Sequence, residues 1–273
     1  MTYKPKKQLG QNFLSDKKIL MKIVESVDIK KDDTILEIGP GQGSLTYHLA
    51  QKAGKVIAVE KDTELVEYLG KKFENLKNLE IINDDILNFL ESGIKNHELW
   101  NKKYIIIGNI PYYLTSFLLR KIFEIKNKPS EIVLMVQKEV AERMVAKPLD
   151  KTRGKQGEMN LLAISVQIFA EPEILFYVSK NSFWPKPKVD SAVIKISNFK
   201  NKISNLDPEK FMVLIKAGFS AKRKLLVNNL SKSLDIPKEK IYDIFRVVGL
   251  DFNVRAQDLS LGDWDNIYKQ INF

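Results

Sequence analysis

Four consecutive residues, Asn109 to Tyr112, combine the groups needed to activate an aromatic amine. The lone pair of such an amine, for example N6 of adenine, is delocalised into its ring, so the nitrogen is a poor nucleophile. The Asn109 side-chain oxygen and the Ile110 carbonyl can both accept from the amine and favour a pyramidal nitrogen. Pro111 holds the turn rigid without adding a donor, and Tyr112 offers a flat face for a base. A strand-end turn with a buried tyrosine explains the same tetrapeptide equally well.

The residues on either side predict where this tetrapeptide lies. The apolar run 104–107 ends at Gly108, which is typical of a buried strand that leads into a loop. Helical spacing begins at Leu114, with Thr115 or Ser116 as the expected N-cap. The tetrapeptide should therefore follow the carboxyl end of a strand, where open α/β sheets bind their ligands.

A glycine-rich turn follows an earlier apolar run of the chain. Its spacing is Glu37-x-Gly39-x-Gly41-x-Gly43, and Ser44 stands where a dinucleotide-binding fold needs a further glycine. Glycines at such a turn allow the backbone to approach a ligand closely. The spacing favours S-adenosylmethionine over a pyrophosphate-containing cofactor.

Two further strands are predicted to end in acidic residues. The run 56–59 ends in Glu60, whose carboxylate suits the two hydroxyls of a ribose. The run 79–82 leads to Asp85, whose carboxylate can accept a hydrogen bond from an adenine amine. Each has an ordinary alternative, because Glu60 can be a surface residue of a turn, and Asp84 or Asp85 can cap a short helix.

The order of these elements predicts the architecture. Strands alternate with helices, and polar ligand candidates stand at four successive strand ends, which indicates an open α/β sheet with its ligand at the carboxyl edge. Further strands are expected over 132–136, 174–178 and 192–196, the last antiparallel to its predecessor. Residues 11–14 mix amides with large apolar groups and can fold over a ligand, ahead of a helix capped at 15–16.

The second half of the chain adds an aromatic loop and a change of composition. Residues 183–191 form a rigid, basic loop, in which Phe183 can hold a base against Tyr112 or merely pack the loop onto the core. The basic stretch 147–157 is interpreted as a solvated loop in preference to a phosphate clamp. Lys, Asn and Ser dominate 198–206, which predicts a linker before an all-helical remainder.

Within this remainder, Lys222, Arg223 and Lys224 lie in a stretch, 213–232, that contains no acidic residue. A helix face with one sign of charge favours contact with phosphates. A solvated face is the ordinary alternative, and the missing counter-charges weaken it.

The composition is that of a two-domain globular protein with a polyanionic partner. The 273 residues carry a net charge of +10, which favours nucleic acid first and a membrane surface second. With no cysteine and two histidines, disulfides and thiolate chemistry are excluded and no metal site is expected. The sequence shows no secretory signal and no apolar run of membrane-spanning length, so a cytoplasmic location away from membranes is expected.

Together these motifs resemble the ribosomal RNA adenine N6-dimethyltransferases of the KsgA type, which act on small-subunit rRNA. The resemblance covers nearly the whole chain. The matching stretches are residues 7–14, 37–43, 108–112, 183–191 and 219–230.

The resemblance implies a Rossmann-like methyltransferase domain over 1–200, with a seven-stranded, mostly parallel sheet and S-adenosylmethionine as cofactor, and a helical rRNA-binding domain over 206–273. The implied catalytic residues are Asn109, Ile110, Pro111, Tyr112 and Phe183. The implied cofactor contacts are Asn12, Leu14, Gly39, Gly41, Gly43, Glu60, Lys61, Asp85, Ile86 and Asn109. The implied RNA contacts are Lys222, Arg223 and Lys224.

The implied substrate is a pair of adjacent adenines in the 3′-terminal hairpin loop of small-subunit (16S) rRNA, presented by the 30S pre-ribosomal particle to a monomeric enzyme. Three alternatives stay open: a large-subunit rRNA methylase of the antibiotic-resistance type, a DNA adenine methylase, and a ribosome-assembly factor with dispensable catalysis. The signature at 219–230 favours the small-subunit reading. Two departures from the family pattern are the segment 156–160 and Lys222, which stands where arginine is common.

Overall fold

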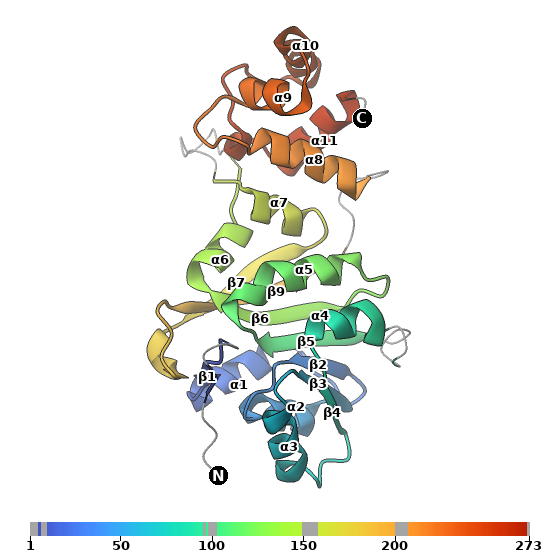
Figure 1. The fold of residues 1–273 in the computed structure, drawn as a ribbon, viewed down its shortest axis with the longest axis vertical. Helices are drawn as coiled ribbons and strands as arrows, with labels where there is room; N and C mark the ends of the chain where they lie inside the picture. Colours follow the sequence, from blue (N-terminus) through green and yellow to red (C-terminus); the bar gives the residue numbers. More distant parts are fainter. Residues whose placement is uncertain are drawn as a thin grey trace. The chain divides into compact units, whose positions relative to one another are not determined.

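The structure of the protein is a computed structural model, which describes residues 5–6, 10–94, 97, 103–148, 158–199 and 207–271. The chain forms two compact units (Figure 1). The first unit comprises residues 1–141 and 171–199, and the second comprises 142–170 and 200–273. Residues 149–157 of the loop predicted at 147–157 lie outside the described residues, and so do 200–206 of the linker predicted at 198–206 and 156–157 of the atypical segment.

A seven-stranded sheet in the order β4-β3-β2-β5-β6-β9-β7 forms the centre of the first unit (Figure 1). The strands are β2 (Thr34–Ile38), β3 (Lys55–Glu60), β4 (Leu79–Asn83), β5 (Tyr104–Asn109), β6 (Glu131–Gln137), β7 (Glu171–Val178) and β9 (Ser191–Ser197). Strands β2 to β6 pair in parallel, whereas β9 is antiparallel to both β6 and β7. This confirms the predicted mostly parallel sheet and its antiparallel last strand.

The order of the strands reverses at β2. Every residue of β2 is buried, as expected for a central parallel strand covered on both faces. Its neighbours are β3 on one side and β5 on the other, which makes its carboxyl end a topological switch point. Ile38 of β2 is in register with Gly108 of β5, so the glycine turn and Asn109 emerge side by side.

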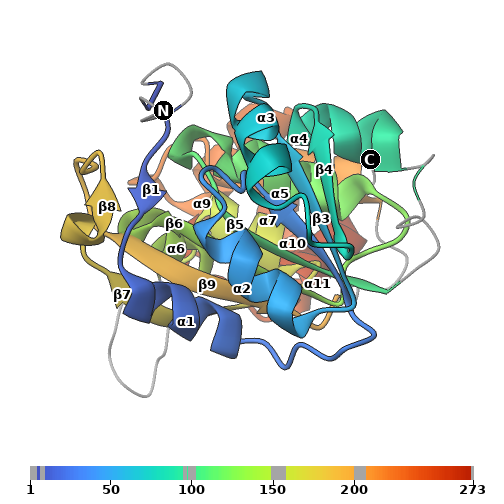
Figure 2. The same cartoon turned by 90° about the horizontal axis from the view of Figure 1, so that it is seen from below.

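Helices cover both faces of the sheet. They are α1 (Lys17–Glu25), α2 (Ser44–Lys52), α3 (Thr63–Lys72), α4 (Ile86–Asn88) and α5 (Thr115–Glu124). The buried faces of α1 and α2 share one core with the sheet, in which Val24 and Leu49 pack with Ile35 and Val56. Helices α4 and α5 contact each other on the opposite side of the sheet (Figures 1 and 2).

The starts of two helices test the predicted caps. Asp16 caps α1 by accepting hydrogen bonds from the backbone N–H groups of Lys18 and Ile19, which confirms the expected cap at 15–16. The predicted cap of α5 at Thr115 or Ser116 is wrong. A 3-10 turn, η5 (Tyr112–Leu114), runs directly into α5, and the Thr115 hydroxyl donates back to the Tyr112 carbonyl at 3.1 Å.

A second, two-stranded sheet joins the N-terminal segment to the aromatic loop. Strand β1 (Phe13–Leu14) pairs antiparallel with β8 (Phe183–Trp184), as seen in Figure 2. The backbone N–H of Ser15 extends this pairing by donating to the Ser182 carbonyl at 2.9 Å. The segment that precedes α1 is therefore fastened to the loop predicted to hold a target base.

The second unit is helical. It contains α7 (Leu161–Gln167), α8 (Pro208–Gly218), α9 (Leu226–Leu234), α10 (Lys238–Val248) and α11 (Leu261–Gln270), and α6 (Lys138–Met144) ends within it. Residues 142–170 belong to it because Met159, Ala163 and Ile164 share a core with Phe211. The domain boundaries 1–200 and 206–273 stay a prediction.

Candidate active site

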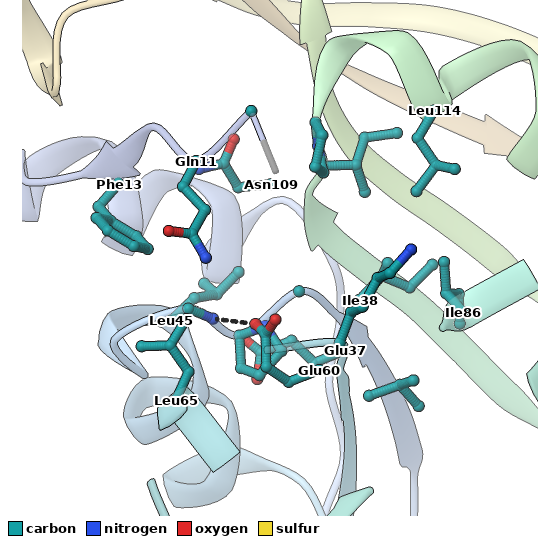
Figure 3. Close-up of a pocket in the computed structure, with 18 of the residues that line it drawn as sticks. Gln11, Phe13, Glu37, Ile38, Leu45, Glu60, Leu65, Ile86, Asn109 and Leu114 are labelled. Carbon is teal, nitrogen blue, oxygen red and sulfur yellow. Dashed lines mark hydrogen bonds between the residues drawn. The ribbon is translucent and has the colours of Figure 1, made fainter. Parts of the chain in front are cut away.

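A cavity of about 210 Å³ lies at the carboxyl ends of β2, β3, β4 and β5 (Figure 3). The predicted residues that line it are Asn12, Leu14, Gly39, Gly41, Glu60, Lys61, Asp85, Ile86, Asn109, Ile110, Pro111 and Tyr112. Two residues predicted for the site, Gly43 and Phe183, are not among the described residues that line this cavity. The fold thus brings together segments that lie almost 100 positions apart in the sequence.

The glycine turn is shaped by two close approaches. Gly41 and Gly43 both have the left-handed backbone, with φ of 58° and 76°. A Cβ on Gly41 would lie 2.9 Å from the Phe13 ring, which covers the turn. A Cβ on Gly43, the N-cap of α2, would lie 2.4 Å from the ring of Phe73, the C-cap of α3, so this glycine allows the two helices to approach. The predicted cofactor contact of Gly43 stays a prediction.

Glu60 ends β3 and fixes the glycine turn from the side. Its carboxylate accepts from the Gly41 N–H at 3.1 Å and from the Asp62 N–H at 2.9 Å. Burial raises the pKa of Glu60, while these two N–H groups oppose the rise by stabilising the charged form. Figure 3 shows its carboxylate at the wall of the cavity. The remaining lone pairs can accept from the hydroxyls of a ribose.

Glu37 is a second carboxyl at the same wall, and it is 1% exposed. Burial raises its pKa to about 8, with a further contribution from nearby Glu60. Within the described part of the chain, its Oε2 is a buried oxygen without a hydrogen-bond partner. An unpaired buried oxygen is costly, so this position fits a ligand with a polar group that can form a hydrogen bond with the carboxyl.

Asp85 and Lys61 form an ion pair at the outer side of the cavity. The Lys61 Nζ lies 2.8 Å from Asp85 Oδ2, and the Leu87 N–H donates to Asp85 Oδ1 at 2.9 Å. Although burial by itself raises it, the hydrogen bond from Lys61 holds the pKa of Asp85 below its usual range. Asp85 is also the N-cap of α4, which confirms that it caps a short helix. Capping does not exclude the other role, because the ionised carboxylate can still accept a hydrogen bond from a base amine.

Asn109 lies where β5 ends, directly beside the glycine turn. A Cβ on Gly39 would lie 3.9 Å from the Asn109 carbonyl oxygen. The Asn109 amide donates from Nδ2 to the Asn12 carbonyl at 3.0 Å. Because this bond uses the nitrogen of the amide, it orients Oδ1 as the acceptor. The acceptor needed to activate an aromatic amine is thus held in place by a residue 97 positions away.

Tyr112 is held through its hydroxyl. The Tyr112 oxygen lies 2.7 Å from the hydroxyl oxygen of Ser191, a fully buried residue at the start of β9. Burial raises the pKa of Tyr112, so the phenol stays neutral at physiological pH. A ring fixed at both ends can serve as a rigid stacking face.

A family model described as ribosomal RNA adenine dimethylase matches residues 2–272. The chain belongs to this family. Ribosomal RNA small subunit methyltransferase A of Mycoplasma mobile is 42% identical over 272 residues and is covered, like this chain, to 100%. A dimethyladenosine transferase from Plasmodium falciparum is 28% identical, with a TM-score of 0.76 over 93% of this chain and 95% of that one. The 23S rRNA methyltransferase ErmE, 23% identical with a TM-score of 0.72 over 94% and 98%, shares the fold.

Sequence reasoning missed how this dimethylase anchors its N-terminal segment. The Lys6 Nζ contacts Asp62 at 2.8 Å and Glu64 at 3.0 Å, and these carboxylates raise the pKa of Lys6. Gln11 donates to the same Asp62 carboxylate at 3.1 Å and accepts from the Lys6 N–H at 2.7 Å. Since the Asp62 N–H donates to Glu60, the chain of contacts reaches the wall of the cavity. The only signal in the sequence was the unusual mixture of amides and apolar groups at 11–14.

Replacing Lys6 with alanine should weaken cofactor binding about 2- to 5-fold, the effect expected of an exposed ion pair. The ion pair holds the segment against Asp62, and thereby steadies Glu60, without lining the cavity itself. Titration calorimetry with S-adenosylhomocysteine measures the change. Lys71→Ala, an exposed lysine on α3, is the control, and equal affinities of the two variants would contradict the anchoring role.

The raised pKa of Glu37 predicts that the free energy of unfolding falls as the pH rises. The folded dimethylase keeps a proton on Glu37 up to about pH 8, whereas the unfolded chain releases it near pH 4.5. The contribution of Glu37 to the free energy of unfolding is therefore fully present below pH 4.5. It declines between pH 4.5 and about pH 8, by up to about 1.4 kcal/mol per pH unit. Urea unfolding of the cofactor-free protein at pH 5 and pH 7.5 should show a smaller decline for Glu37→Gln than for wild type. An unchanged decline in that variant would show that Glu37 is ionised in the fold.

Phe183 is buried rather than open to the cavity. It is 5% exposed and shares a core with Leu14, its partner in the β1–β8 pairing. Its neighbour Trp184 is 55% exposed. Stacking of Phe183 on a target base therefore requires a movement of this loop, and its catalytic role stays a prediction.

The three predicted RNA contacts, Lys222, Arg223 and Lys224, are exposed. They lie on a turn between α8 and α9, so the prediction of a helix face is wrong. Asn229 holds this turn, because its side chain donates to the Gly218 carbonyl at 2.6 Å and to the Ala221 carbonyl at 3.0 Å. This buried amide explains why an asparagine follows the basic residues in the C-terminal signature.

The described part of the chain offers neither a metal site nor a membrane-spanning helix. It contains no group of three or more acidic or histidine side chains arranged to hold a metal ion. None of its helices is both long enough and apolar enough to span a bilayer.

Proposed function

We propose that this rRNA adenine dimethyltransferase methylates the N6 amines of two adjacent adenines in the 3′-terminal hairpin loop of small-subunit rRNA. The enzyme class and the rRNA substrate follow from the family and from relatives that cover the whole chain. The observation that supports the chemistry is the Asn109 amide, held by Asn12 at the wall that the glycine turn also forms.

S-adenosylmethionine is the methyl donor, and it supplies an electrophilic methyl carbon bound to a sulfonium. The residues of the cavity fit it, because Glu60 offers acceptors for ribose hydroxyls and Asp85 an acceptor for the adenine amine. The unpaired Oε2 of Glu37 offers a hydrogen-bonding position to a polar group of such a ligand. Together these groups bind one molecule across three neighbouring strand ends.

At the substrate side, Asn109 Oδ1 and the Ile110 carbonyl accept the two N6 hydrogens and direct the lone pair of the nitrogen. Tyr112 supports the extruded base from one face. The adenine nitrogen forms a bond to the methyl carbon as the carbon–sulfur bond breaks, and the amine proton then passes to water. Since the alkylated amine is acidic, no dedicated base is needed and catalysis is largely positioning.

The exposed basic turn at 222–224 supports phosphate contact by the helical unit. We assign this unit the role of an RNA-binding domain, and the working form of the enzyme is a cytoplasmic monomer acting on the 30S pre-ribosomal particle. The likeness to ErmE bears on the fold alone. The small subunit methyltransferases among the relatives favour the small subunit over that protein's 23S substrate.

Mass mapping of methylated adenines tests the proposal. Unmethylated small-subunit RNA, the corresponding 30S particles and large-subunit RNA are each incubated with the protein and isotopically labelled cofactor. Two adjacent dimethylated adenines in the 3′-terminal hairpin loop are expected. Label in the large-subunit RNA instead would establish the rival substrate, and particle binding without any transfer would establish an assembly factor.

A further inference from the structure

A row of exposed side chains on η5 and α5 has no role in the reaction described above. Tyr113 is 60% exposed, Phe117 is 65% exposed, and the Arg120 side chain is 79% exposed. Phe117 and Arg120 are three residues apart and lie on one face of α5, and Tyr113 precedes them on η5. The other face of α5 is already buried through Leu118 and Ile122, which leaves the aromatic face without a packing role.

This row begins at the rim of the catalytic cavity. Tyr113 directly follows the catalytic tetrapeptide and lines the cavity, where its ring lies 3.4 Å from the Cβ position of Gly10. Phe117 and Arg120 line a second, shallow hollow, and Leu87 lines both hollows. The row therefore begins at the rim of the cavity and continues into the neighbouring hollow.

The charges along the row point to bases rather than to phosphates. Arg120 pairs with Glu124 at 2.9 Å, and Lys121 lies 3.3 Å from Glu91 and 3.7 Å from Glu124. Because their neighbours neutralise these cations, little local field is left to hold a backbone phosphate. The exposed aromatic faces are the remaining recognition elements, and every nucleobase can stack on such a face.

The spacing of the two rings suits a nucleotide strand. Four helical residues rise about 6 Å along the axis. One stacking step of about 3.4 Å separates a base from each of its neighbours, so the two neighbours lie two steps apart. A base extruded from its stack also leaves its neighbours without a stacking partner, and an aromatic surface at the mouth of the site can replace it.

We propose that Tyr113 and Phe117 form a stacking platform for the single-stranded RNA nucleotides that flank the extruded adenine. This inference rests on the proposed function, because the platform holds the RNA whose adenine enters the cavity. It makes Phe117 a determinant of RNA affinity that touches neither the cofactor nor the reacting nitrogen.

Three variants separate this role from a structural one. Phe117→Ala removes the outer ring, Phe117→Trp keeps a larger one, and Tyr47→Ala removes an aromatic side chain that is 49% exposed on α2. Thermal melting compares their folding. The probe is the hairpin RNA with 2-aminopurine beside the target adenine, bound to protein saturated with S-adenosylhomocysteine.

Phe117→Ala should weaken RNA binding about 10-fold, restore 2-aminopurine fluorescence in the complex, and raise the KM for RNA with kcat unchanged. The dissociation constant of S-adenosylhomocysteine should stay at the wild-type value, and Phe117→Trp and Tyr47→Ala should bind RNA like wild type. Wild-type RNA affinity in Phe117→Ala overturns the platform, as does a defect seen with ribosomal particles only, which indicates a protein contact. Failure of the wild-type enzyme to methylate the RNA is a separate measurement, and it overturns the proposed function instead.

Discussion

Replacing Asn109 with alanine is expected to lower the rate of methyl transfer about 100- to 1000-fold, the loss typical of one oriented electrostatic contact in an active site. The variant loses the Oδ1 acceptor that directs the N6 lone pair, and it also loses the bond to the Asn12 carbonyl. The measurement is the single-turnover rate with RNA and cofactor both saturating, so that a change in affinity does not mask a change in chemistry.

The fold of the Asn109 variant should persist, because the hydrophobic core of β5 lies in the residues before it. Asn181→Ala, at an exposed position in a 3-10 turn, is the matched control and should transfer methyl groups at the wild-type rate. A single-turnover rate close to wild type in Asn109→Ala would remove the central step of the proposed mechanism.

The second large effect is expected at Glu60. Glutamine has the same shape but replaces one acceptor oxygen with a donor, so either the Gly41 N–H or the Asp62 N–H faces another N–H group. Leaving one buried donor unsatisfied costs about 1–3 kcal/mol. Glu60→Gln should therefore melt earlier and bind S-adenosylhomocysteine about 10- to 100-fold more weakly, as measured by calorimetry.

Glu67→Gln, at an exposed position on the following helix, provides the comparison for Glu60. The two variants differ in whether the carboxylate holds the glycine turn. If Glu60→Gln bound the cofactor as tightly as Glu67→Gln does, the ribose-binding role of Glu60 would be untenable.

The sequence was most informative for strands that are buried along nearly their whole length. The apolar runs before Gly39, Glu60 and Asn109 each predict a buried strand, and the structure places all three in the parallel part of the sheet. The parallel arrangement then requires their carboxyl ends to meet at one edge. The cavity wall at these strand ends could therefore be predicted from local patterns alone.

Contacts between distant segments could not be predicted in this way. The Lys6–Asp62 ion pair joins residues 56 positions apart, and neither residue type is unusual at its place in the sequence. The burial of Phe183 depends on the pairing of β1 with β8, each of two residues, which is too short to produce a periodic pattern. The aromatic side chain itself is equally compatible with stacking on a base and with packing in a core.

The pairing of β1 with β8 has a consequence for how two methyl groups reach one nitrogen. Residues 11–14 line the cavity proposed to bind the cofactor, and the backbone of residues 13–14 pairs with β8 in the loop assigned to the target base. Because one segment contacts both places, we expect exchange of a spent donor for a fresh one to disturb it, and with it the loop assigned to the target base. We therefore expect distributive turnover, in which singly methylated RNA leaves the enzyme and returns for its second modification.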